Sequence, residues 1–216
     1  MPYINPYVAK SQEHPRIVTD AAALAARRGG WSRELGGLPV WLEVGVGMGR
    51  FFRDRAGREL DKAFVGFEIR FKRLYNTASK LDPTRPTGWA LAKAMGQDVA
   101  RYFSPGELAG AFVLFPDPWA KKKQRKHRLV RAPFLRDLAA CVRPGGTFVF
   151  KTDHQEYFAT SLAEEFPQVP EWKLSYETRD LHADPENDAR YIHTEFEDMT
   201  TQKEGAKICL AEFTRI

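Results

Sequence analysis

The chain has 216 residues, 43% of them hydrophobic, and a net charge of +5 from 33 lysine and arginine side chains against 28 aspartates and glutamates. This length and apolar content suit one large domain with a sizeable core, and they exclude an intrinsically disordered chain. The sequence has neither the ~18 consecutive apolar residues of a membrane-spanning helix nor the basic head and apolar core of a signal peptide, so we expect a cytoplasmic protein.

Short apolar segments alternate with longer helix-like segments along the chain. Strands are predicted at 40–44, 63–68, 89–93, 111–115, 147–152, 172–178 and 207–213. Helices are predicted at 19–28, 50–60, 70–81, 133–142 and 155–166. Strands and helices that alternate in this way favour an α/β fold, in which a seven-stranded, mostly parallel sheet carries helices on both faces.

The remaining segments are loops and an N-terminal extension. Residues 1–38 carry no motif and are predicted to form an extension, with 39–216 as the main domain. Prolines mark 82–87 as a loop, and the polar segment 180–190 is expected to be the most mobile one. Cys141 and Cys209 each stand alone in apolar surroundings, so they indicate neither a disulfide framework nor a zinc knuckle.

Much of the positive charge is concentrated in one octet, residues 121–128. This octet holds six of the 33 basic side chains and no acid, and the rest of the chain then has 27 basic and 28 acidic side chains. A cationic segment on a nearly neutral body is typical of a surface that contacts phosphates, because each neutralised phosphate releases a counterion. The alternative is an ordinary solvated loop. RNA contacts are predicted for Lys122, Lys123, Arg125, Lys126, His127 and Arg128.

A glycine-rich segment lies where the first predicted strand of the sheet turns into a helix. Gly45, Gly47 and Gly49 let the backbone bend tightly and approach a ligand there. Dinucleotide sites usually have G-x-G-x-x-G, whereas this segment has G-x-G-x-G, preceded two residues earlier by Glu43. A carboxylate at that place would repel a pyrophosphate and attract a cation. The sulfonium and ammonium groups of S-adenosylmethionine therefore fit better than NAD.

Two further acids follow the next two predicted strands. Glu68 ends the second strand, where a carboxylate can accept hydrogen bonds from both ribose hydroxyls of a cofactor; the alternative is an ordinary surface acid. Asp98 follows the third strand and could accept a hydrogen bond from an adenine amino group. An equally ordinary role for Asp98 is to cap the N-terminus of a helix.

The fourth strand ends in the segment Phe115-Pro116-Asp117-Pro118-Trp119. In such sheets this strand is next to the cofactor, at the point where ligands bind. An aromatic ring beside an acid on a proline-stiffened loop suits a flat nucleobase, because Trp119 can stack on the ring and Asp117 can accept from its N–H groups. The alternative is that Trp119 covers the core and Asp117 stabilises its turn. The octet follows at once, which favours a nucleic-acid substrate.

From about residue 42 onwards the sequence resembles the bacterial tRNA (guanine-N7-)-methyltransferases. The resemblance rests on the glycine segment with Glu43, on Gly66-Phe67-Glu68, on the segment 115–119 with Lys121-Lys122, on Lys151-Thr152-Asp153 and on Thr194-Glu195-Phe196-Glu197. It implies a Rossmann-like class I methyltransferase fold. It also implies S-adenosylmethionine at Glu43, Glu68, Asp98 and Asp117, with Asp117 at the catalytic centre, and tRNA contacts at Lys121, Asp153, Thr194, Glu195, Phe196 and Glu197.

The activity that this resemblance implies is methyl transfer to N7 of a guanine in the variable loop of tRNA. N7 carries a free lone pair, so no general base is needed, and a carboxylate such as Asp117, Asp153 or Glu197 would stabilise the positive charge on the purine. Two positions depart from the family pattern: Ala120 stands where histidine is usual, and Glu195 where lysine is common.

Three other functions stay open at this point. The protein could methylate another base or an exocyclic amine, or it could be a non-catalytic RNA-binding module, although the module leaves Glu43 and Glu68 unexplained. A nicotinamide oxidoreductase is disfavoured by the glycine spacing. The histidines, including His127, His154 and His193, show no ligand spacing, so no metal is expected. The chain is expected to be a monomer or a homodimer.

Overall fold

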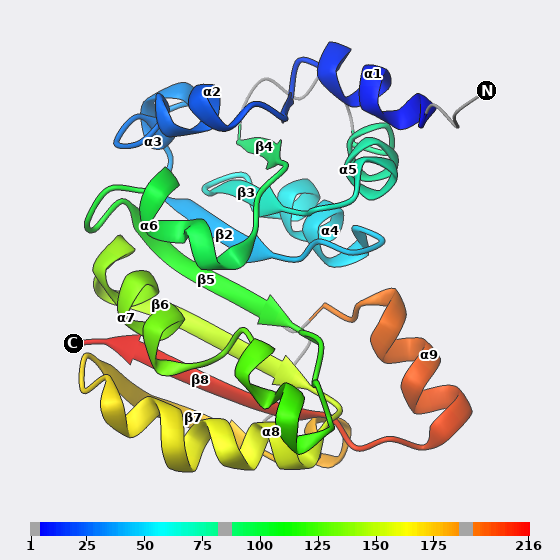
Figure 1. The fold of residues 1–216 in the computed structure, drawn as a ribbon, viewed down its shortest axis with the longest axis vertical. Helices are drawn as coiled ribbons and strands as arrows, with labels where there is room; N and C mark the ends of the chain where they lie inside the picture. The colour runs from blue at the N-terminus through cyan, green and yellow to red at the C-terminus, as the bar shows by residue number, and fades with distance from the viewer. Residues whose placement is uncertain (1–4, 82–87, 186–191) are drawn as a thin grey trace.

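The strands in the described part of the chain form one sheet of eight strands, in the order β1-β4-β3-β2-β5-β6-β8-β7 (Figure 1). The computed structural model describes residues 5–81, 88–185 and 192–216. The strands are β1 (Ile17–Val18), β2 (Val40–Val44), β3 (Ala63–Phe67), β4 (Trp89–Ala92), β5 (Leu108–Leu114), β6 (Val142–Thr152), β7 (Trp172–Thr178) and β8 (Cys209–Arg215). All neighbouring pairs are parallel except β6 with β8 and β8 with β7.

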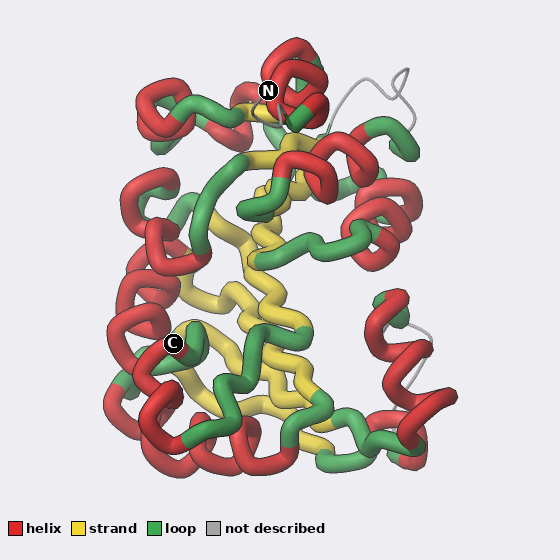
Figure 2. Tube along the Cα trace, turned by 45° about the vertical axis from the view of Figure 1, so that its right-hand side comes forward, coloured by secondary structure: helices red, strands yellow, loops and turns green. Residues whose placement is uncertain are grey.

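Helices cover both faces of this sheet (Figure 2). They are α1 (Pro6–Glu13), α2 (Ala21–Ala25), α3 (Trp31–Glu34), α4 (Arg50–Arg58), α5 (Phe71–Ala78), α6 (Val99–Tyr102), α7 (Ala132–Cys141), α8 (Gln155–Thr160) and α9 (Glu195–Glu204). One apolar core joins the sheet to α2, α3, α6, α7 and α8, and a second joins its other face to α4 and α5. None of the helices described is long and apolar enough to cross a membrane.

The strand order reverses direction at β2. From β2 the chain adds β3 and then β4 on one side, and it returns to add β5 and β6 on the other side. The carboxyl ends of β2, β3 and β5 therefore lie at one edge of the sheet, with the β2 end in the middle. In open α/β sheets a ligand binds at this reversal, because the loops on its two sides diverge.

All seven predicted strands are present, and the α/β fold with a mostly parallel sheet is confirmed. The eighth strand, β1, comes from the predicted extension. It is two residues long, so it leaves no periodic signal in the sequence. Only its pairing with β4, with Ile17 opposite Leu91, defines it as a strand. Helices α1, α3, α6 and α9 were also not predicted. The predicted loop 82–87 and residues 186–190 of the predicted mobile loop lie outside the described residues.

Gly66 on β3 is packed so tightly that no side chain fits. A Cβ atom there would lie 2.5 Å from Val46 Cγ1, 2.7 Å from Leu91 Cδ2 and 2.9 Å from Phe52 Cε2. Since this core cannot expand without strain, Gly66→Ala should lower the free energy of unfolding by about 1–3 kcal/mol in urea titrations. Gly57→Ala is the control, because Gly57 is exposed near the end of α4 with nothing within 4 Å of a Cβ, and it should be neutral or stabilising.

Candidate functional site

The glycine loop after β2 leaves its backbone open to a ligand. Gly45, Gly47 and Gly49 have φ angles of +83°, +55° and +84°, values that residues with a side chain rarely adopt. A Cβ on Gly49 would lie 2.1 Å from Thr77 Oγ1, so Gly49 packs against α5. Among the described residues, nothing lies within 4 Å of a Cβ on Gly45, and the nearest atom to one on Gly47 is 3.9 Å away. A ligand can therefore approach the first two glycines directly.

Glu43 lies beneath this loop with an unpaired carboxyl oxygen. The residue is 3% exposed, and its Oε2 is buried without a hydrogen-bond partner among the residues that the structure describes. Burial, together with the negative charge of Glu195, raises the pKa of Glu43 to about 8. An unpaired buried carboxyl group is costly in a folded protein unless a ligand supplies the partner. A cationic ligand such as the ammonium group of S-adenosylmethionine would supply it.

Glu68 fixes the glycine loop from the end of β3. Its Oε2 accepts a hydrogen bond from the Gly47 amide at 3.1 Å, and its Oε1 accepts one from the Arg70 amide at 2.9 Å. A carboxylate has about four acceptor positions, so Glu68 can still accept from two ribose hydroxyls. The residue is 4% exposed, which corrects the alternative of an ordinary surface acid. The donors and acceptors of this edge thus fit S-adenosylmethionine.

Asp98 occupies the N-cap position of α6, at the carboxyl edge of β4. Its side chain accepts no capping hydrogen bond from α6, and it is half-buried. The geometry therefore does not support the capping role that the sequence left open for Asp98.

The loop after β5 holds two residues other than glycine in the left-handed region. Phe115 has φ +50° and Trp119 has φ +43°, conformations that cost about 1–3 kcal/mol each. Asp117 between them is exposed. Trp119 is 37% exposed, and its ring lies 5.4 Å from the ring of His127. Trp119 is therefore available to a ligand and does not cover the core.

The octet folds into a short 3₁₀ helix, Lys122–His127, that displays most of its cations. Lys121, Lys122, Lys123, Lys126 and His127 are exposed. Arg125 is partly exposed and forms an ion pair with Glu156 at 2.9 Å. These positions fit contacts with phosphates.

Arg128 departs from the predicted RNA contact because its guanidinium is buried. It donates to the Pro118 carbonyl at 2.7 Å, to Thr160 Oγ1 at 3.0 Å and to Glu156 Oε2 at 2.5 Å. The hydrogen bond from Arg128 to Glu156 Oε2 is the main reason why the pKa of Glu156 is lowered. Arg128 thus anchors the loop of Trp119 and the octet to α8. Sequence spacing cannot separate such an anchor from its exposed neighbours.

Helix α9 begins with the acidic segment that follows Thr194 and is fastened to β6 by a buried ion pair. The Thr194 hydroxyl accepts from the Glu197 amide at 3.0 Å, and the Glu197 carboxylate accepts from the Thr194 amide at 3.3 Å. The same carboxylate lies 2.6 Å from Lys151 Nζ, with side-chain exposures of 0% and 1%. Glu197 is therefore turned inward. Sequence reasoning missed this pair, because Lys151 and Glu197 are 46 residues apart in the chain.

Two further acidic residues of α9, Glu195 and Asp198, reach α4, the helix that follows the glycine loop. Glu195 Oε2 accepts from the Arg50 amide at 3.2 Å, and Glu195 Oε1 lies 3.6 Å from Arg53. Asp198 pairs with the Arg50 guanidinium. The Phe196 ring lies 5.1 Å from that of Phe115. The structure thus brings three of the predicted site segments together, namely the glycine loop, the loop after β5 and the start of α9.

Two histidines lie near Glu197, although their spacing in the sequence gave no sign of it. Ligand atoms of His182, His193 and Glu197 all lie within 4.8 Å of one another. His182 Nε2 is 3.2 Å from Glu197 Oε1, and His193 Nδ1 is 3.1 Å from Asp198 Oδ1. The carboxylate of Glu197 is also bound to the Lys151 ammonium group, so a positive charge already faces it.

Asp153, the last predicted contact, is half-buried just beyond β6.

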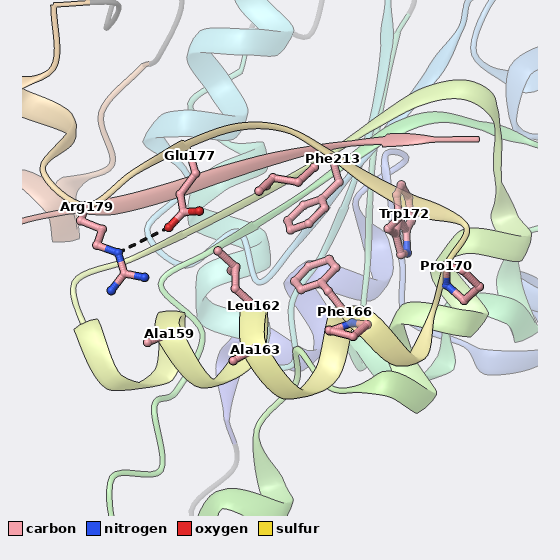
Figure 3. Close-up of a pocket in the computed structure, with 11 residues that line it drawn as sticks. Ala159, Leu162, Ala163, Phe166, Pro170, Trp172, Glu177, Arg179 and Phe213 are labelled. Atoms are coloured by element: carbon pink, nitrogen blue, oxygen red, sulfur yellow. Dashed lines mark ion pairs between the residues drawn. The ribbon is translucent and has the colours of Figure 1, made fainter.

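An apolar groove of about 480 Å³ lies away from the carboxyl ends of β2, β3 and β5. It is between the helical segment that follows β6 and the outermost strand β7 (Figure 3). Leu162, Phe166, Trp172 and Phe213 line it, and the rings of Phe166 and Phe213 stack 3.7 Å apart. None of the predicted site residues lines this groove.

Comparison with solved structures identifies the class of the fold. The 16S rRNA methyltransferase KamB matches with a TM-score of 0.59 and 16% identity over 90% of this chain and 91% of that one. A 16S rRNA (adenine(1408)-N(1))-methyltransferase from Catenulisporales acidiphilia, solved with its cosubstrate, matches with a TM-score of 0.55 and 16% identity over 91% and 92%. The fold is that of the class I methyltransferases that use S-adenosylmethionine, as the resemblance implied.

Comparison with sequences gives the family. A family model described as "Putative methyltransferase" matches residues 38–210. The tRNA (guanine-N(7)-)-methyltransferase of Levilactobacillus brevis is 30% identical over 98% of this chain and 95% of its own length, and that of Oenococcus oeni is 30% identical over 86% of each. The chain belongs to the tRNA (guanine-N(7)-)-methyltransferase family.

One relative is much longer than this chain. The bifunctional glycosyltransferase/methyltransferase of Fusobacterium nucleatum is 28% identical over 98% of this chain, which spans 33% of that protein's length.

Glu43→Gln should weaken the binding of S-adenosylmethionine and stabilise the ligand-free protein. Without the ion pair to the cofactor's ammonium group, the affinity should fall about 10- to 100-fold in calorimetric titrations. The pKa of about 8 in the folded protein lies above the ordinary value of 4.5, so the wild type loses stability as pH rises between these values. The melting temperature of Glu43→Gln should therefore exceed that of the wild type by a margin that grows up to pH 8.

Glu164→Gln, an exposed change far from the loop, is the control and should move neither quantity. A Glu43→Gln protein that binds the cofactor as tightly as the wild type would contradict the role of this carboxylate.

Proposed function

We propose that this protein transfers a methyl group from S-adenosylmethionine to N7 of a guanine in the variable loop of tRNA. The observation that carries the proposal is that the exposed cations of the octet and the Trp119 loop lie at the same sheet edge as Glu43 and Glu68. A polyanionic substrate bound to the octet would present its bases to the cofactor. Membership of the family supports the same activity.

The chain's own residues would hold the cofactor by charge and by hydrogen bonds. Glu43 would pair with the ammonium group, and Glu68 would accept from the ribose hydroxyls. Asp98, whose carboxylate makes no capping bond, would accept from the adenine amino group. Gly45 and Gly47 would let the methionine part approach the backbone. The exclusion of water from this edge would strengthen each of these electrostatic contacts.

The chemistry requires positioning more than proton transfer. S-adenosylmethionine supplies a sulfonium methyl group, and the carbon–sulfur bond breaks as the N7 lone pair forms the new bond. Asp117 would hold the guanine and stabilise the positive charge that the purine acquires. Trp119 would stack on the base, and the two prolines beside Asp117 limit the entropy that the loop loses on binding. No proton has to leave N7, so no general base is needed.

The substrate contacts divide between the octet and the start of α9. Lys121, Lys122, Lys123 and Lys126 would contact phosphates, with Arg125 and His127 beside them. Thr194, Glu195, Phe196 and Asp153 border the same edge and would shape the space for the base. Glu197 would act through its ion pair with Lys151, which fixes α9.

The reaction product tests the proposal directly. Unmodified tRNA transcripts are incubated with the protein and labelled S-adenosylmethionine, and the methylated nucleoside is identified after digestion. The expected product is 7-methylguanosine, and mass spectrometry of nuclease fragments should place it in the variable loop. Label in another nucleoside would overturn the acceptor, and label elsewhere in the tRNA would overturn the location.

Asp117→Asn should lower kcat about 10²- to 10³-fold while the fold persists, because a neutral amide cannot balance the charge on the purine. Steady-state methylation assays give kcat, and the melting temperature reports the fold. Asp61→Asn, an exposed change in the turn before β3, is the control. Near-normal turnover by Asp117→Asn would exclude Asp117 from the catalytic centre.

Replacing Lys121, Lys122, Lys123 and Lys126 together by Ala should weaken tRNA binding and lower its salt dependence. Because these four side chains would no longer neutralise phosphates, the slope of log K against log salt should fall by about three. Cofactor affinity should stay the same. The control is an Arg58, Arg143 and Lys173 triple Ala variant, because these exposed cations lie toward the opposite edge of the sheet. An unchanged slope for the octet variant would show that the octet does not bind phosphates.

A further inference from the structure

A second stretch of basic residues without an acid follows β3. Residues 69–80 contain Arg70, Lys72, Arg73 and Lys80 and neither aspartate nor glutamate. They form α5 and its flanks. The proposed function makes no use of them, since it assigns the RNA contacts to the octet and α9.

Helix α1 adds to this stretch by packing against α5 (Figure 1). Lys10 Nζ lies 5.7 Å from the ring centre of Tyr7 and 5.4 Å from that of Tyr75, and Lys72 Nζ lies 5.8 Å from the Tyr7 ring. The two rings are 6.0 Å apart. The aromatic faces hold both ammonium groups without neutralising them. We call Lys10 and Lys72, with the rings of Tyr7 and Tyr75 beneath them, and Arg70 at the N-cap of α5 the α1–α5 surface.

The cations of this surface are available to a partner. Lys10, Arg70 and Lys72 are exposed, and within the described part of the chain no ion pair joins any of the three to an acid. Arg73, by contrast, lies 3.8 Å from Glu68 and so belongs to the cofactor edge.

The topology places the α1–α5 surface and the octet on opposite sides of the glycine loop. The order β3-β2-β5 puts the β2 end between the other two, α5 follows β3, and the octet follows β5. Strands two places apart in a sheet are about 10 Å apart. A chain of phosphates that crosses the glycine loop would therefore meet cations on both sides.

We propose that the α1–α5 surface is a second contact for the tRNA phosphate backbone, across the cofactor loop from the octet. The proposal rests on the proposed function, because it takes the same RNA. The proposed partner is a polyanion that contacts the octet as well as the α1–α5 surface. A surface that binds only anionic lipid would not require the octet.

The test is the salt dependence of tRNA binding by a triple variant, Lys10→Gln, Arg70→Gln and Lys72→Gln, whose glutamines keep much of the packing on the rings. Fluorescence anisotropy between ~50 and ~200 mM salt should give a slope of log K against log salt that is smaller by about two to three. KM for tRNA should rise, while kcat and the affinity for S-adenosylmethionine should stay at wild-type values, because glutamine at position 70 keeps the backbone amide that donates to Glu68. The control changes Arg58, Arg143 and Lys173 to Gln and should keep the wild-type slope.

A wild-type slope in the α1–α5 variant would overturn this proposal. If the octet variant still binds tRNA more weakly in that case, the proposed function stands. If neither variant changes the slope, the RNA contacts of the proposed function fail as well. Weaker binding of the α1–α5 variant to vesicles with anionic lipid, with tRNA binding unchanged, would assign the surface to a membrane and would also overturn the proposal.

Discussion

The burial of the Glu43 carboxyl group at the end of β2 is the constraint around which the site is built. One of its oxygens has no hydrogen-bond partner in the described part of the chain, and the pKa of about 8 means that the group gives up its charge when no cationic ligand is bound. The charges of Arg55 and Lys151 offset only part of this cost. The protein thus keeps a destabilising group in its interior, and the proposed pairing with a cationic cofactor would make this a common compromise between stability and activity.

Helix α9 depends on a long-range interaction of the opposite kind. Lys151 and Glu197 are both buried and paired with each other, and their ion pair joins β6 to a helix 46 residues later in the chain. Burial lowers the pKa of Lys151, whereas Glu197 raises it. Such a pair contributes little net stability compared with an apolar one, but the loss of one partner leaves a buried charge and is costly. Its value here is therefore the fixed position of α9 beside α4 and the loop after β5.

The sequence predicted the parts of this structure that depend on local patterns. The seven longer strands have apolar runs, and Glu43, Glu68 and the glycines occupy fixed positions at strand ends. Strand β1 could not be predicted, because two residues show no period and only the pairing with β4 makes them a strand. The inward turn of Arg128 and Glu197 was equally hidden, since it depends on Glu156 and Lys151, which are distant in sequence. The roles proposed for the site residues in catalysis and RNA binding remain predictions.

The anchoring of Arg128 has a consequence for how the neighbouring cations would meet a partner. Its three hydrogen bonds tie one end of a cationic segment to Pro118 and to α8, so the other cations stand on a loop that already has a defined shape. A segment that is ordered before binding loses little conformational freedom when a polyanion arrives. Long-range attraction would then set the rate of encounter, and the shape of the loop would set how long each complex lasts.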